Sequence, residues 1–174
     1  VARRQKEKLR LAEATADERA SLERHIAWLD AEIAAVEAER DALLREDTAL
    51  ARANTLLRSI PGIGPVAATT LLALMPELGA ASPQTIAALA GLAPFNVDSG
   101  ESRGHRAIRG GRKRVRTALY IAAVTAARSK ARFSAYLEGL RARGKPAKLA
   151  IIALARKILI TANAILRDNV PFQA

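Results

Sequence analysis

The stretch Leu57-Arg58-Ser59-Ile60-Pro61-Gly62-Ile63-Gly64-Pro65 decides the fold of the chain around it. It follows a long run without Gly or Pro and places two glycines among hydrophobic residues, so a helix is expected to end there. Pro65 stands where a second helix begins, a position at which its missing N–H costs no hydrogen bond. The pattern therefore predicts two helices joined by a short turn, over about residues 48–74.

This spacing is typical of a helix-hairpin-helix, a module whose turn amides and second helix N-terminus bind a DNA phosphate without reading bases. Gly62 and Gly64 are therefore candidate nucleic-acid-binding residues. Val66 stands where a lysine often follows the turn, so the hairpin geometry is better supported than phosphate binding. A Pro-Gly turn between two helices also needs no ligand at all, and that alternative stays open.

The 59 residues that end at Ser59 favour long helices, because they contain neither Gly nor Pro and are rich in Ala, Glu, Arg and Leu. A break is expected near Thr15 to Asp17, since either residue can cap a new helix. Arg3 to Ala14 would then fold back as the first arm of a hairpin, and Asp47 is a second candidate cap. We expect residues 1–47 to form a coiled-coil region.

A heptad pattern in this region predicts self-association. Apolar side chains recur at alternating spacings of four and three residues, with polar residues at some positions between them, at Leu22, Ile26, Leu29, Ile33, Val36, Leu43, Leu50 and Leu57. A single helix carrying all of them would be roughly 55 Å long, more than a small domain can cover. We therefore expect a homo-oligomer contact, and we interpret His25 and Trp28 beside the pattern as packing residues.

The residues after the turn predict more helices and show no strand alternation. Ser82 is the expected N-cap of a short helix that begins at Pro83 and stops at Gly91. Longer helices are expected at Val115 to Ala131, Phe133 to Arg141 and Ala147 to Arg167. The last should be the central core helix. The predicted fold class is all-α, with a long N-terminal helical hairpin or coiled coil followed by a compact helical domain over residues 48–174.

Residues 94–116 carry the most conspicuous chemistry, a serine followed by arginines on a glycine-rich backbone. Ser99 precedes Gly100 and is the candidate nucleophile. Dense donors on a permissive backbone suit an anion. The candidate nucleic-acid-binding residues here are Arg103, Gly104, Arg106, Arg109, Arg112, Lys113, Arg114 and Arg116. Cations at a helix N-terminus oppose the macrodipole, so a compensating polyanion is expected. The alternative is a solvated basic loop with a turn serine.

Charge and composition narrow the class of partner. The net charge is +11, and residues 60–174 hold 17 Lys and Arg against 5 Asp and Glu, whereas the preceding residues hold 11 against 12. Such an excess is expected of a surface that meets nucleic acid. We expect no membrane partner, because no apolar run approaches the length of a transmembrane span and no signal peptide opens the chain. With no cysteine and two histidines, we expect no metal site.

Several segments together resemble one family. They are Ser21 to Leu29, the turn from Leu57 to Pro65, Gly91-Leu92-Ala93-Pro94-Phe95-Asn96 with Asp98-Ser99-Gly100, Leu119-Tyr120 with Ala122-Ala123, and Gly144-Lys145-Pro146-Ala147-Lys148. The chain resembles the transposases of the insertion-sequence family numbered one hundred and ten, with its 116/902 group and DNA-invertase relatives. The resemblance covers nearly the whole chain.

The resemblance implies a two-part recombinase acting in the bacterial cytoplasm at the nucleoid. An N-terminal RuvC-like domain, expected outside this chain, would hold Mg²⁺ with an Asp-Glu-Asp-Asp cluster, so no cofactor is expected here. The family's essential serine matches Ser99, and its Gly-x-Arg matches Gly104 and Arg106. A structured bridge RNA would guide it to DNA. We expect this chain to bind nucleic acid without catalysing alone.

Two other classes of function remain open. The chain can be a non-enzymatic DNA-binding and oligomerisation module, in which the serine loop only contacts phosphate. It can also be a structural RNA-binding protein, although the basic stretch lacks stacking aromatic residues. Tyr120 and Phe133 are near enough to it to serve, and we interpret both as core residues. Replacement of Ser99 by Ala separates the enzyme from the first alternative.

Overall fold

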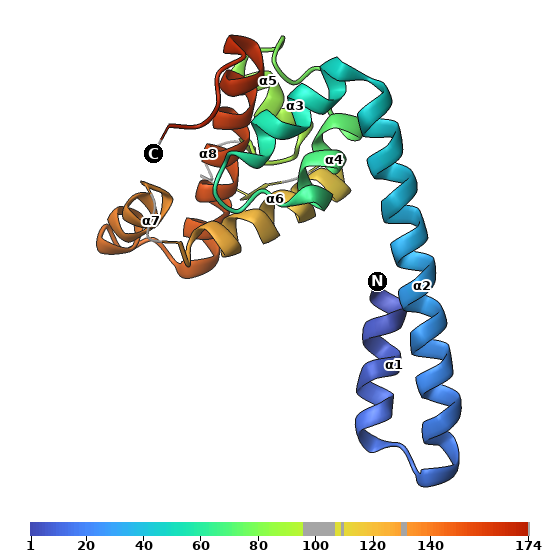
Figure 1. Cartoon of the computed structure of the whole chain (residues 1–174). Coiled ribbons are helices and arrows are strands. Elements are labelled where there is room, and N and C mark those ends of the chain that lie inside the picture. The colour runs from blue at the N-terminus through green and yellow to red at the C-terminus, as the bar shows by residue number, and fades with distance from the viewer. Residues whose placement is uncertain (96–106, 109, 130–131, 174) are drawn as a thin grey trace. The chain divides into compact units, whose positions relative to one another are not determined.

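The computed structural model describes residues 1–95, 107–108, 110–129 and 132–173, and helices dominate this part of the chain (Figure 1). The predicted all-α class is confirmed. Two strands of two residues each, β1 (Pro94–Phe95) and β2 (Ala107–Ile108), form the β structure of the described residues. The helices are α1 (Ala2–Glu13), α2 (Ala16–Glu46), α3 (Thr48–Arg58), α4 (Pro65–Leu74), α5 (Pro83–Leu89), α6 (Lys113–Ala126), α7 (Arg132–Ala142) and α8 (Ala147–Asp168).

Contacts divide the chain into two units, of which the first, Val1–Thr48, is a hairpin of α1 and α2 (Figure 1). The predicted break at Thr15 is confirmed, because the Thr15 amide donates to the Glu18 carboxylate over 3.2 Å as the N-cap of α2. Leu22 and Ile26 are buried in this unit. Because α1 has 12 residues and α2 has 31, α1 does not cover the C-terminal part of α2. Val36 and Leu43 in that part are exposed.

Two predictions about this region were wrong. The heptad pattern does not run through one helix, because α2 ends at Glu46 and α3 starts at Thr48. Leu57 consequently belongs to the core of the second unit. Trp28 is not a packing residue in the chain, since 56% of it is exposed and its ring stacks on His25 with centroids 6.1 Å apart.

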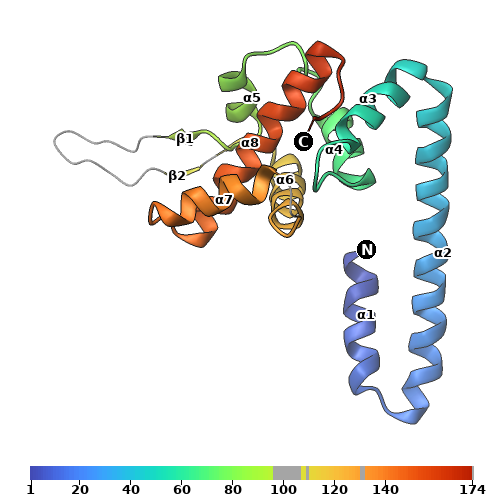
Figure 2. The same ribbon diagram turned by 60° about the vertical axis from the view of Figure 1, so that its left-hand side comes forward.

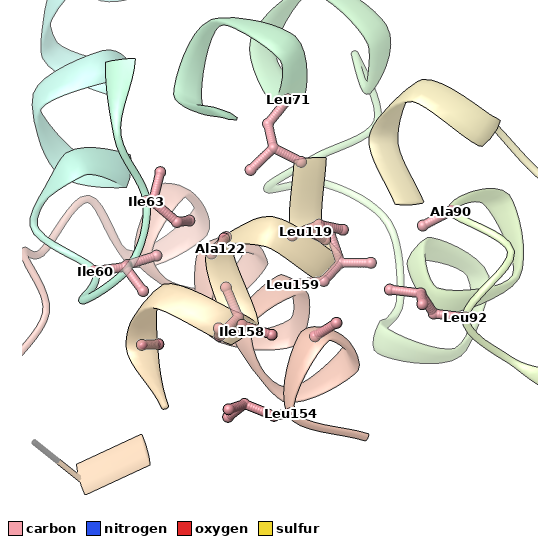
Figure 3. Packing of buried hydrophobic residues seen from close by; sticks show 14 of the residues in the cluster. Ile60, Ile63, Leu71, Ala90, Leu92, Leu119, Ala122, Leu154, Ile158 and Leu159 are labelled. Atoms are coloured by element: carbon pink, nitrogen blue, oxygen red, sulfur yellow. The ribbon is translucent and has the colours of Figure 1, made fainter. Parts of the chain in front are cut away.

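The second unit, Ala49–Ala174, is built on α8, against which α5, α6 and α7 pack (Figure 2). The predicted central helix is therefore confirmed. Helix α4 packs on α6. Figure 3 shows residues from the turn before α4, from α4, α6 and α8, and from the segment after α5 converging on one apolar core. Small alanines at helix contacts, such as Ala122 of α6, let the helices approach closely.

Helix α8 corrects the expectation that no apolar run is long enough for a membrane. It has 22 residues, and its most apolar window reaches a mean hydropathy of 1.9. Its apolar positions nevertheless serve the protein core, since Leu154, Ile158 and Leu159 are fully buried between the packed helices. The buried Asn163 also binds the chain before α5, accepting from Gly79 N–H over 2.7 Å and donating to Ala81 O over 3.0 Å.

Local signals placed most other helices correctly. The Ser82 hydroxyl accepts from the Thr85 amide at the start of α5, as its N-cap role requires. Helix α6 buries the predicted face, although it starts at Lys113 and ends at Ala126 instead of Ala131. The buried residues of that face are Val115, Leu119, Ala122, Ala123 and Ala126.

Candidate nucleic-acid interface

Residues 89–95 and the described part of 107–112 form what we call the neck. Strands β1 and β2 pair antiparallel there, with Pro94 opposite Ile108 and Phe95 opposite Ala107. This pairing brings together the two ends of the chain segment that carries the candidate nucleophile (Figure 2). The predicted residues Ser99, Arg103, Gly104, Arg106 and Arg109 lie outside the described residues.

Two glycines let the two sides of the neck touch. Gly91 and Gly111 both have φ of +68°, a region that suits glycine. A Cβ on Gly111 would overlap the backbone of Gly91, and a Cβ on Gly91 would overlap the carbonyl oxygen of Gly110. The Arg112 amide also donates to Leu89 O over 2.9 Å. The backbones are therefore in direct contact at the base of the neck.

Arg112 and Glu77 fix the neck to the domain. The Arg112 guanidinium donates from Nη1 to Glu77 Oε2 and from Nη2 to Oε1, each over 2.6 Å, and Nη1 also lies 3.2 Å from Met75 Sδ. The hydrogen bonds from Arg112 lower the pKa of Glu77 to about 2 and raise the pKa of Arg112. Both groups of this fork-shaped pair are charged at neutral pH.

This pair bears on two expectations about Arg112. It was a candidate nucleic-acid contact, but both terminal nitrogens of its guanidinium are held by Glu77. It is also the N-cap residue of α6, so the Glu77 carboxylate supplies an anion close to that helix N-terminus. An external polyanion is therefore not needed to compensate the charge of Arg112.

The remaining basic residues at the start of α6 divide by exposure. Arg116 is half-buried and donates from Nη1 to Gly110 O, so its side chain also contacts the neck. Lys113 and Arg114 are exposed. They border an open groove of about 550 Å³ between α4 and α6. Among the predicted nucleic-acid-binding cations that the structure describes, these two side chains are the ones exposed to solvent.

The two glycines of the turn before α4 have different structural roles. Gly62 has φ of +91°, and a Cβ there would overlap the Ala122 carbonyl oxygen of α6. Gly64 is exposed at the N-cap of α4, with φ of −87° and open space where a Cβ would stand. Gly62 therefore serves packing, whereas Gly64 leaves the start of α4 accessible. Val66, at the position where a lysine often follows such a turn, is 63% exposed.

The sequence reasoning missed Glu77 and a cluster of aromatic residues beside α7 and α8. One signal for Glu77 was present, since residues 60–174 contain only five acids. A lone carboxylate in a basic domain has many possible partners, and its pairing with Arg112, 35 positions away, has no local signature. The aromatic cluster joins Phe133 and Tyr136 to Phe172.

Comparison with known proteins gives one consistent family. The sequence profile of the Transposase IS116/IS110/IS902 family matches residues 54–138. The pilin gene-inverting protein of Moraxella bovis is 35% identical over 122 residues, which cover 68% of this chain and 38% of that protein. An uncharacterized 43.6 kDa protein of insertion element IS110 from Streptomyces coelicolor is 33% identical over 121 residues, covering 68% of this chain and 30% of that protein.

An uncharacterized 42 kDa protein of insertion element IS900 from Mycobacterium paratuberculosis is 33% identical over 117 residues. That match covers 66% of this chain and 29% of the relative. The chain thus covers between 29% and 38% of the length of these curated relatives. The matched region contains the turn before α4, the neck and α6.

Proposed function

The chain belongs to the IS116/IS110/IS902 transposase family, and on this basis we propose that it is the DNA-binding, serine-bearing part of a recombinase that cuts and rejoins DNA strands. The relatives support recombination in general, since one is described as a pilin gene-inverting protein. We also propose that the active enzyme works in the bacterial cytoplasm and takes its base choice from a structured guide RNA.

The neck is the observation that supports this proposal most. A nucleophile must be held close to its reacting phosphorus, and both ends of the Ser99 segment are anchored by β1 and β2. The Arg112–Glu77 pair joins that anchor to the chain after α4. The DNA contacts of the proposal are Gly64 and the exposed Lys113 and Arg114 of the described chain, together with the arginines that follow Ser99.

The proposed chemistry is a pair of transesterifications. The Ser99 oxygen forms a bond to a backbone phosphorus, while the bond from that phosphorus to the neighbouring nucleotide oxygen breaks and this oxygen takes up a proton. A hydroxyl of another strand later attacks the phosphoserine and releases the serine, so no bond energy is lost. Arg103, Arg106 and Arg109 would bind the phosphate oxygens, on which negative charge accumulates.

In this proposal, Mg²⁺ would be held by the acid cluster of the N-terminal domain alone. Within residues 1–95, 107–108, 110–129 and 132–173, no three His, Cys, Asp or Glu side chains come together that could hold a metal ion. The described residues thus do not form a Mg²⁺ site.

Replacement of Ser99 by Ala in the full-length enzyme tests the proposal. The Ser99→Ala variant should bind DNA as the wild type does and should lose strand exchange, whereas Ser102→Ala, three residues along the same segment, should retain both. Full strand exchange by Ser99→Ala would instead favour a non-enzymatic DNA-binding and oligomerisation module. The uncovered Val36 and Leu43 on α2 support the oligomerisation part of either function.

A salt titration tests the phosphate contacts separately. Each cation that neutralises a phosphate of duplex DNA contributes roughly −0.9 to the slope of log affinity against log salt concentration. Replacing Lys113 and Arg114 together by Gln should make the slope less steep by up to about 2. Arg24→Gln with Arg45→Gln, which removes two cations from α2, is the charge-matched control and should leave the slope unchanged.

A further inference from the structure

A second pocket lies beside α7 and α8, with a volume of about 700 Å³. Its walls come from α7, from the last three turns of α8 and from the segment Val170–Gln173. It shares no lining residue with the α4–α6 groove, and none of its lining residues belongs to the neck. This volume is in the range of pockets that hold small ligands.

Aromatic rings gather at this pocket although aromatic residues are rare in the chain. Phe133, Tyr136 and Phe172 all line it, and they are three of six Phe, Tyr and Trp residues in the sequence. Phe133 is 2% exposed and stacks against Phe172 with ring centroids 5.4 Å apart. Phe172 and Tyr136 are half-buried, so each has part of its surface left for a ligand.

Hydrogen bonds at two positions hold the segment that carries Phe172. The Phe172 amide donates to the Ser59 hydroxyl over 2.9 Å. Asn169 ends α8 in the left-handed conformation, with φ of 52°, and its side-chain and backbone oxygens accept from Arg52 at 3.3 Å each. The ring of Phe172 is thus held in place in advance of binding, which reduces the entropy lost when a flat ligand stacks on it.

The chain that forms α7 and α8 is basic, which favours an anionic ligand. Between Arg132 and Asp168 the sequence has eight Lys and Arg and two Asp and Glu. Lys157 is exposed at the pocket wall. The carboxylate in the lining, Asp168, accepts from Arg167 at 2.8 and 3.2 Å, so its charge is partly neutralised by a neighbour. Single-stranded nucleic acid binds where aromatic rings lie beside cations. Its bases stack on the rings, and its phosphates contact the cations.

We infer that this pocket receives one unstacked base of a single-stranded nucleic acid, which stacks on Phe172 and Tyr136 while Lys157 binds an adjacent phosphate. The inference depends on one part of the proposed function, namely that the protein binds nucleic acid. It adds a contact to the single strand that recombination exposes or that a guide RNA supplies. An apolar peptide is the competing occupant, but it gives no role to the exposed Lys157 in the pocket wall.

Abasic oligonucleotides provide the sharpest test. We would measure binding of the full chain to fluorescein-labelled single-stranded DNA and RNA in which one nucleotide at a time lacks its base. For the wild type, an abasic site at the bound position should weaken binding by about 5- to 150-fold, the range for loss of one stacked base. The arm with the larger loss identifies DNA or RNA as the natural ligand.

Variants connect that loss to the pocket. Phe172→Leu keeps an apolar side chain against Phe133 but removes the flat ring, so it should bind intact oligonucleotides as weakly as the wild type binds the abasic probe. It should also become insensitive to the abasic site. Tyr120→Ala is the matched control, since Tyr120 is an aromatic residue on α6 that is 38% exposed and does not line the pocket.

Three results would overturn the inference. They are equal abasic losses in the wild type and in Phe172→Leu, an equal loss of affinity in Tyr120→Ala, and absence of single-strand binding by the wild type. Circular dichroism melting shows whether Phe172→Leu is folded. If it is not, Tyr136→Leu takes its place, with the same expectations. A result against the pocket leaves the Ser99 test of strand exchange untouched, so the two ideas can fail separately.

Discussion

Arg112 and Glu77 are joined by two parallel hydrogen bonds of 2.6 Å between guanidinium and carboxylate. The pair connects Arg112, the last residue of the neck, to the chain after α4, and the Arg112 amide simultaneously donates to Leu89 O. One residue therefore links three parts of the domain. We propose that Arg112 positions the segment that carries Ser99, and the phosphate contact expected of Arg112 from the sequence stays a prediction.

Replacing Glu77 by Gln should loosen the neck without unfolding the domain. The amide keeps the size of the side chain but loses the charge that holds both guanidinium nitrogens. Because the pair is partly exposed, we expect the Arg112 amide to exchange its hydrogen up to about fivefold faster. Native-state hydrogen exchange measures this. Asp30→Asn, which breaks the Arg4–Asp30 pair in the first unit, is the control and should leave exchange at Arg112 unchanged.

The same pair should respond to acid in a defined window. The pKa of Glu77 is about 2 in the fold against 4.5 for an unperturbed glutamate, so the stabilisation is complete above pH 4.5 and is lost as the pH falls toward 2. A ¹³C NMR titration of the Glu77 carboxyl carbon should give a midpoint near 2. A midpoint near 4.5 in the folded protein would contradict the pairing with Arg112.

The glycines of the turn and neck should differ in their tolerance of alanine. Gly62→Ala and Gly111→Ala should each lower the free energy of unfolding by at least about 1–3 kcal/mol, because φ is positive and no room exists for a methyl group. Gly64→Ala meets open space and should cost about 1 kcal/mol or less. Urea denaturation measures all three. Equal losses in the three variants would contradict the packing described for Gly62 and Gly111.

Self-association should depend on the uncovered part of α2. Val36→Glu combined with Leu43→Glu places charges on exposed apolar positions and should convert an oligomer to monomers, since a buried pair of charges cannot be solvated in the contact. Sedimentation equilibrium measures the mass. Ala34→Glu with Asp41→Glu changes exposed positions outside the heptad pattern and should leave the mass unchanged. A wild type that is monomeric at all concentrations would contradict the contact.

Local chemistry made the helices predictable. The signals that placed them act within a few residues and can be read directly from the sequence. They are the caps at Thr15 and Ser82, the prolines at the starts of α4 and α5, and the apolar face of α6. Asp47, a candidate cap, signalled the end of α2 at Glu46, although the continuing heptad pattern favoured one long helix. The core of the second unit competes for Leu57 and overrides that pattern.

The candidate site was predictable only in part, because its decisive contacts join residues far apart in the sequence. Gly91 meets Gly111, Glu77 meets Arg112 and Phe133 meets Phe172. Tyr120 illustrates the same limit, since it was expected in the core and is 38% exposed, whereas Phe133 is buried as expected. Composition identified a basic domain, but tertiary packing selects which cations face solvent.

Mass spectrometry of the protein–DNA adduct tests the central proposal most directly. The full-length enzyme would be incubated with a DNA substrate whose rejoining strand lacks its attacking hydroxyl, so that the covalent intermediate accumulates, and then digested with protease and nuclease. We predict a peptide carrying a nucleotide phosphate on Ser99, absent from Ser99→Ala and present in Ser102→Ala. An adduct on another residue, or cleaved DNA with no adduct on any residue, would contradict Ser99 as the nucleophile.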